Sequence, residues 1–186
     1  MNVYCPRIVN IASQYVGKVG VIGNEMQGAD HLIKFLTEAG KNIVMWTPQR
    51  RKAIEQGMWL LATKDGGTTN ENEPGRISWC GVFACWVLKQ AGLNVEWRNS
   101  QIQINDPKQM KSIFPVNPAD LKAIGRGDVC VINTAGKTNY HHFIVNRWGD
   151  PNLETIEGNV SVPRQGVVAK TRLLKDVIRI YRLLVD

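Results

Sequence analysis

Apolar residues recur at intervals of three and four along the first part of the chain, the spacing typical of amphipathic helices. This pattern predicts helices over residues 6–17, 29–39 and 48–62. A polar loop rich in glycine and asparagine follows over 63–76. The strongly apolar segment after it predicts a mostly buried helix over 80–91, with Cys80 in its first turn.

The last third of the chain changes to short runs rich in valine and isoleucine. Turns of glycine, asparagine and proline separate these runs, which is typical of strands joined by hairpins. The predicted strands are 128–132, 141–147, 153–156, 167–171 and 177–184. Residues 93–125 show a mixed pattern, with one short amphipathic piece at 118–124. Helices first and strands second predict an α+β fold with a C-terminal antiparallel sheet.

Length and composition are those of one globular domain spanning residues 1–186, with 44% hydrophobic and 21% charged residues. No apolar run approaches the roughly 20 residues of a membrane helix, so no membrane span is predicted. The first residues lack a basic segment followed by an apolar stretch, so no signal peptide is predicted either. The net charge is +7, from 23 Lys and Arg against 16 Asp and Glu. The basic residues are scattered and form no nucleic-acid recognition motif, so we expect no nucleic-acid partner.

The four cysteines do not form a metal-binding pattern. Cys80 and Cys85 have no second close pair of ligands, and the adjacent His141 and His142 lack the spacing of zinc-finger ligands. We therefore predict no metal and no cofactor. Cys5, Cys85 and Cys130 are expected to be small buried apolar side chains.

Cys80 differs from the other cysteines because it begins a predicted helix directly after a polar loop. The unpaired N–H groups and the positive end of the helix dipole at that place favour a thiolate, which is a nucleophile. A thiolate nucleophile also needs a basic partner from elsewhere in the fold.

The predicted hairpin supplies that partner. His141 and His142 open one strand, and the next strand ends in Glu157-Gly158-Asn159. Antiparallel pairing across the turn at 149–152 would place Glu157 or Asn159 beside the histidines. Each residue alone has a common structural explanation as core, cap or turn. Their joint order predicts a nucleophile, a base and a residue that orients the base.

Four short motifs resemble those of the CHAP-domain amidases and peptidases, which belong to the NlpC-type, papain-like peptidoglycan hydrolases. The motifs are WCGVF at 79–83, GDV at 127–129, HHFIV at 141–145 and IEGN at 156–159. The resemblance covers about residues 10–160. It implies a papain-like fold in which the nucleophile lies at a helix N-terminus packed on the antiparallel sheet. It also implies catalytic roles for Cys80, one of the paired histidines, Glu157 and Asn159.

Two departures from the family pattern concern the segment before Trp79 and the doubled histidine. The segment at about 41–76 is longer than usual and is expected to be an insertion or a lid. An ungapped overlay aligns His141 with the catalytic histidine, and strand alternation then places Phe143 and Val145 on its face. We prefer His141 as the base, and we expect only one of the two histidines to meet the Cys80 thiolate, because successive strand residues point to opposite faces. His142 remains the alternative, because Phe143 replaces a usually small residue.

The resemblance implies a cell-wall amide hydrolase that works through a thioester, with the Cys80 backbone N–H as an oxyanion donor. Such a protein would be made in the cytoplasm of a bacterium or of a phage-infected cell. It would act in the periplasm or cell wall after export or injection, as a phage lysin or an antibacterial effector. Its substrate is peptidoglycan, and an effector would also have an immunity protein as partner. The alternatives are a cysteine protease or transamidase acting on protein, and a non-catalytic papain-like binding domain.

Overall fold

The computed structural model describes residues 4–22, 25–39, 48–55, 79–134, 140–160 and 166–184. The helices are α1 (Tyr4–Ser13), α2 (Ala29–Ala39), α3 (Pro48–Glu55), α4 (Cys80–Gln90) and α5 (Pro118–Lys122), with a 3-10 turn at Leu174–Asp176. The first five strands are β1 (Gly20–Ile22), β2 (Glu25–Gln27), β3 (Val95–Arg98), β4 (Gln101–Ile104) and β5 (Met110–Ile113). The others are β6 (Val129–Asn133), β7 (Tyr140–Arg147), β8 (Asn152–Val160), β9 (Gly166–Leu173) and β10 (Val177–Leu183). The predicted α+β class is confirmed.

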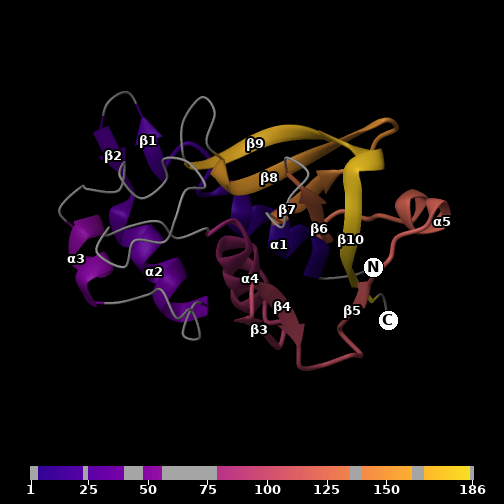
Figure 1. Cartoon of the computed structure of the whole chain (residues 1–186), viewed down its shortest axis with the longest axis horizontal. Coiled ribbons are helices and arrows are strands. Elements are labelled where there is room, and N and C mark those ends of the chain that lie inside the picture. The colour runs from indigo at the N-terminus through magenta and orange to yellow at the C-terminus, as the bar shows by residue number, and fades with distance from the viewer. Residues whose placement is uncertain are drawn as a thin grey trace.

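The strands form one large and one small antiparallel sheet. The large sheet has the order β2-β1-β9-β8-β7-β6-β10-β5, and β3 pairs with β4 in the small one. Strands β6 to β9 are sequential neighbours joined as hairpins, because turn residues separate them in the sequence. Strand β10 then returns to the far side of β6, next to β5 (Figure 1).

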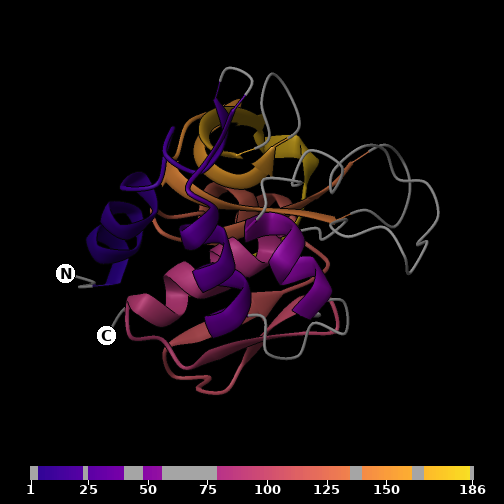
Figure 2. The same ribbon diagram turned by 90° about the vertical axis from the view of Figure 1, so that its left-hand side faces the viewer.

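Helix α4 is the central element of the core. Every residue from Cys80 to Leu88 is buried, because α4 packs on β7 and β8 on one side and on α1 and α2 on the other. Figure 2 shows α2 and α4 together on one side of the orange and yellow strands. Phe35 of α2 packs on Trp86 of α4 with ring centroids 4.6 Å apart, and the Trp86 indole donates to Glu38 at 2.7 Å. The uniformly apolar sequence of this segment therefore reflects burial on all sides.

Two glycines bring the first turn of α4 close to the two sheets. A Cβ added to Gly158 on β8 would lie 2.7 Å from the Trp79 ring and 2.9 Å from the Cβ of Phe83. A Cβ added to Gly81 on α4 would lie 2.0 Å from the Trp97 ring on β3. Real Cβ atoms do not approach other atoms so closely, so both positions exclude a side chain. The glycine of WCGVF therefore lets the first turn of α4 pack on β3, and the glycine of IEGN lets the same turn pack on β8.

The GDV segment has a structural role at the start of β6. Asp128 is buried and accepts hydrogen bonds from the backbone N–H groups of Gly125 and Leu183, both at 2.9 Å. Burial raises the pKa of its carboxyl to about 6, although these hydrogen bonds oppose the shift. Gly127 has a φ of +88°, and a Cβ there would lie 3.1 Å from the Cα of Cys5. Asp128 thus connects the start of β6 to Leu183 of β10, and Gly127 allows the close approach to Cys5 of α1.

Several sequence-based boundaries differ from the structure. The helix expected over 6–17 ends at Ser13 and continues as turns, and strands β1 to β5 were not predicted. Strands therefore also occur between the helices. They were not predicted because strands of three or four residues carry too little periodicity to detect. Cys5 is only partly buried, contrary to expectation.

Part of the expected insertion or lid at 41–76 is described. Residues 48–55 form α3, and the remainder of this segment, including residues 56–62 of the helix expected over 48–62, lies outside the described residues. Within the described ranges, no helix has the length and apolar character needed to cross a membrane.

We predict that Gly158→Ala destabilises the fold, because the added methyl group would overlap Trp79 and Phe83. Overpacking of this kind costs about 1–3 kcal/mol, measurable as a lower midpoint of denaturant unfolding. Gly125→Ala is the control, because a Cβ there meets only the Asp128 carboxylate, at 3.8 Å. Equal unfolding midpoints for the two variants would show that α4 does not need this close approach.

Candidate active site

Cys80 lies at the N-terminus of α4, beside the first residue of β7. Its Sγ is 3.8 Å from the carbonyl oxygen of Tyr140, and the side chain is 3% exposed. The preceding residue, Trp79, makes no side-chain cap for the helix. The first-turn N–H groups of a helix have no acceptor within the helix, and their partial positive charge favours an anion. The thiol therefore lies where the local backbone favours its ionised form.

His141 and Glu157 extend from neighbouring strands and meet on one face of the large sheet. Val145 pairs with Thr155, so alternation along both strands places His141 and Glu157 on the same face. The imidazole Nε2 is 2.9 Å from Oε2 of Glu157. Because Nε2 faces the carboxylate, Nδ1 is the nitrogen left for the hydrogen bond between the ring and the Cys80 thiol. The structure thus brings Cys80, His141 and Glu157 into one connected group.

Glu157 is fully buried, and its charge is compensated by three partners. Besides His141, Arg172 on β9 donates from Nε to Oε1 at 2.7 Å and from Nη2 to Oε2. Thr155 donates from Oγ1 to Oε1 at 2.6 Å. A buried carboxylate without such partners would be strongly destabilising. Burial favours the neutral acid, yet these hydrogen bonds outweigh it and lower the pKa of Glu157 to about 2.

The protonation states of Cys80 and His141 follow from the same contacts. Burial disfavours the thiolate, but hydrogen bonds from both His141 and His142 hold the pKa of Cys80 well below its ordinary value. Burial also disfavours an imidazolium at His141, but hydrogen bonds to Cys80 and Glu157 raise its pKa to about 9. These contacts therefore favour a thiolate at Cys80 and an imidazolium at His141, the active form of a cysteine nucleophile with its histidine.

His142 also reaches the thiol, contrary to the expectation that only one of the paired histidines could meet it. Its ring lies on the opposite sheet face from His141, with its centroid 5.1 Å from that of Trp97 and 6.3 Å from that of Tyr181. Alternation along the strand would limit the thiol to one histidine only if Cys80 lay over one face of the sheet. The thiol instead lies at the beginning of β7, where side chains from both faces converge on it.

Asn159 is not joined to the histidine in the described part of the structure. It has a φ of +58° at an irregularity in the pairing between β8 and β9, and it is partly exposed. No hydrogen bond within the described residues links its side chain to His141. Of the two candidate orienting residues, Glu157 is thus the one that contacts the imidazole.

Within the described part of the chain, no histidine hydrogen-bonds any of the other three cysteines, and basic residues act on them only through weaker charge effects. All four cysteines carry free thiols. Burial raises the pKa of Cys85 to about 12 and that of Cys130 well above its ordinary value. Among the residues that the structure describes, no cluster of three or more His, Cys, Asp or Glu side chains could hold a metal ion.

Two residues of the site, Arg172 and Thr155, were not predicted from the sequence. Thr155 could have been found, because residues two apart on a strand share a face, and Thr155 precedes Glu157 by two. Arg172 could not have been found, because its contact with Glu157 depends on the register between β8 and β9. That register includes an irregularity after Glu157. A chain with many scattered arginines gives no signal for this one.

We predict that any amide hydrolysis by this protein declines above about pH 9, because the neutral form of His141 cannot protonate a leaving amine. Glu157→Gln should move this alkaline limb to lower pH, because the carboxylate helps to raise the pKa of His141. Glu154→Gln is a matched control on the same strand, since Glu154 pairs with the exposed Arg147. Steady-state rates across pH measure the effect. A limb unchanged in Glu157→Gln would contradict the role of this carboxylate.

Comparisons with known families, curated proteins and solved structures found no similar protein. No family model matches the chain, no curated protein matches it, and no solved structure matches it. The functional argument therefore rests on the motifs and on the geometry of Cys80, His141 and Glu157.

Proposed function

We propose that this chain is a papain-like cysteine hydrolase that cleaves an amide bond of peptidoglycan. One observation carries the proposal: a buried thiol at a helix N-terminus hydrogen-bonds a histidine that a buried carboxylate holds from the neighbouring strand. The order along the chain, Cys80, His141, Glu157, is that of the CHAP and NlpC motifs that the sequence resembles.

In the proposed reaction, the Cys80 thiolate adds to the amide carbonyl and forms a tetrahedral oxyanion. The amino end of α4 stabilises this negative charge. As the C–N bond breaks, the His141 imidazolium donates its proton to the leaving amine, and a thioester remains on Cys80. His141, now neutral, takes a proton from water as the water attacks the thioester. The products are a carboxylic acid and the restored thiolate–imidazolium pair.

Glu157 acts in both steps without changing its own protonation. Its hydrogen bond to Nε2 fixes the ring with Nδ1 toward the thiol, and its charge stabilises the imidazolium. Arg172 and Thr155 keep the carboxylate in place and ionised. A carboxylate with a pKa of about 2 stays anionic throughout the pH range in which the pair operates.

The peptidoglycan substrate is inferred from the four motifs and is consistent with the net charge of +7, which suits a polyanionic cell wall. We place the action of the protein in the periplasm or cell wall, as a phage lysin or an antibacterial effector. In the second case a producing cell would need an immunity protein.

The test is digestion of purified peptidoglycan, with mass spectrometry of the released fragments. Cys80→Ala should lower hydrolysis by at least about 10⁴-fold, as the loss of a catalytic nucleophile does. Cys85→Ala is the control on the same helix. It should keep most of the turnover and lose about 1 kcal/mol of unfolding free energy, because Cys85 is a buried core residue.

The fragments also identify the bond that is cleaved. Full activity in Cys80→Ala would contradict the proposed nucleophile. Cleavage of casein without release of peptidoglycan fragments would instead favour a protease acting on protein.

A further inference from the structure

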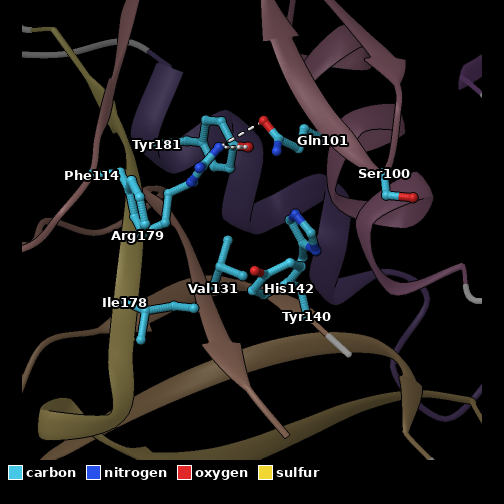
Figure 3. A pocket seen from close by; sticks show the side chains of 9 residues that line it. All are labelled: Ser100, Gln101, Phe114, Val131, Tyr140, His142, Ile178, Arg179 and Tyr181. Atoms are coloured by element: carbon cyan, nitrogen blue, oxygen red, sulfur yellow. Dashed lines mark hydrogen bonds between the residues drawn. The ribbon is translucent and has the colours of Figure 1, made fainter. Parts of the chain in front are cut away.

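A pocket opens on the sheet face opposite His141, next to the second histidine. Tyr140 and His142 of β7 line it together with Arg179 and Tyr181 of β10, Gln101 of β4 and the exposed Phe114 (Figure 3). It has about 340 Å³ of empty space, its open mouth included. The pocket adjoins the reactive centre, because Sγ of Cys80 contacts the Tyr140 carbonyl and also hydrogen-bonds His142.

Arg179 brings a positive charge into this pocket and has no carboxylate partner among the described residues. Its Nη1 donates to Oε1 of Gln101 at 2.8 Å and to the Tyr181 hydroxyl at 3.5 Å, as the dashed lines in Figure 3 show. Its Cζ lies 4.8 Å from the centre of the Phe114 ring. None of the described residues lining the pocket is Asp or Glu, and no salt bridge joins Arg179 to a described carboxylate. Neutral groups thus hold the guanidinium in place, and its charge remains available to an anion.

His142 supplies a second unsatisfied polar group. The side chain is 3% exposed, and its Nδ1 has no hydrogen-bond partner among the described residues. A buried polar atom without a partner is costly, so such atoms in native structures call for an explanation. Figure 3 shows the ring directed into the pocket from β7, on the same side as Arg179. A bound group with oxygen acceptors would lie beside the His142 ring and accept hydrogen bonds from Arg179.

We propose that this pocket is a subsite for a carboxylate that the substrate carries close to the cleaved amide. The carboxylate would accept hydrogen bonds from Arg179, while Phe114 covers the adjacent apolar part of the ligand. This inference rests on the proposed function, because it concerns the substrate of Cys80. It restricts that substrate to amides with an acidic residue or a free peptide carboxyl terminus near the attacked carbonyl.

The test uses alkylating agents that react with Cys80 without needing hydrolysis. Matched acid and amide reagents of increasing length are iodoacetate and iodoacetamide, then bromoacetylglycine and bromoacetylglycinamide, then their glycylglycine homologues. Peptide mapping by mass spectrometry measures the rate at Cys80 in the full chain. At the length that reaches Arg179, the acid should react about tenfold faster than its amide, the effect of one charge-assisted hydrogen bond.

Three variants assign the preference to its source. Arg179→Gln should remove the preference for the acid, and Arg179→Lys should retain part of it. Arg147→Gln is the control, because it removes the same charge from an exposed site at the other end of β7 and should leave the preference unchanged. Equal rates for acid and amide at every length in the wild type would overturn the subsite. A preference for the acid reagent that survives in Arg179→Gln would also overturn the subsite.

Reactivity toward iodoacetamide separates failure of the subsite from failure of the proposed function. If Cys80 reacts with this neutral reagent faster than the partly exposed Cys5 but shows no preference for acids, only the subsite is wrong. If Cys80 reacts no faster than Cys5, it is not an activated nucleophile, and the proposed function is overturned together with the subsite.

Discussion

The close approach of the first turn of α4 to the strands around it is the constraint on which the site depends. Gly158 admits the Trp79 ring and the Cβ of Phe83, and Gly81 admits the Trp97 ring. A side chain at either glycine would push the helix away from the strands and move Cys80 from the start of β7. Core packing of this density transmits such a shift, because there is little empty space to absorb it. The residues around Cys80 in the sequence are therefore the ones that fix its position.

Glu157 couples the stability of the fold to the chemistry of the site. Its pKa in the folded chain is about 2 against an ordinary 4.5, so it contributes stability above pH 4.5 that is lost as the pH falls toward 2. The same carboxylate fixes His141 and, together with the hydrogen bond between His141 and Cys80, raises the pKa of His141 to about 9. Arg172 makes both effects possible, because it compensates a charge that burial would otherwise neutralise. The same carboxylate thus positions His141 and forms the buried ion pair with Arg172.

The sequence predicted the long elements and the central residues of the site, but not the contacts that cross the sheet. The helices at 29–39 and 80–91 and the five C-terminal strands have enough periodicity to be detected, and the structure contains all of them. Most differ only slightly at their ends, but the strand predicted at 153–156 extends to Val160 as β8. Strands β1 to β5 are too short to be detected. Arg172 depends on pairing register, which the sequence does not specify. The contact of His142 with the thiol was missed because alternation along a strand does not reveal that the thiol lies at its end.

The central claim is that His141, held by Glu157, maintains the Cys80 thiolate, and the most direct test is the titration of that thiolate. Its ultraviolet absorbance can be followed against pH in the wild type, in His141→Ala and in His142→Ala, with Cys80→Ala as the blank. The account predicts that His141→Ala raises the pKa of Cys80 far more than His142→Ala does, because only His141 is anchored by a carboxylate. A larger rise in His142→Ala would contradict it and make His142 the base.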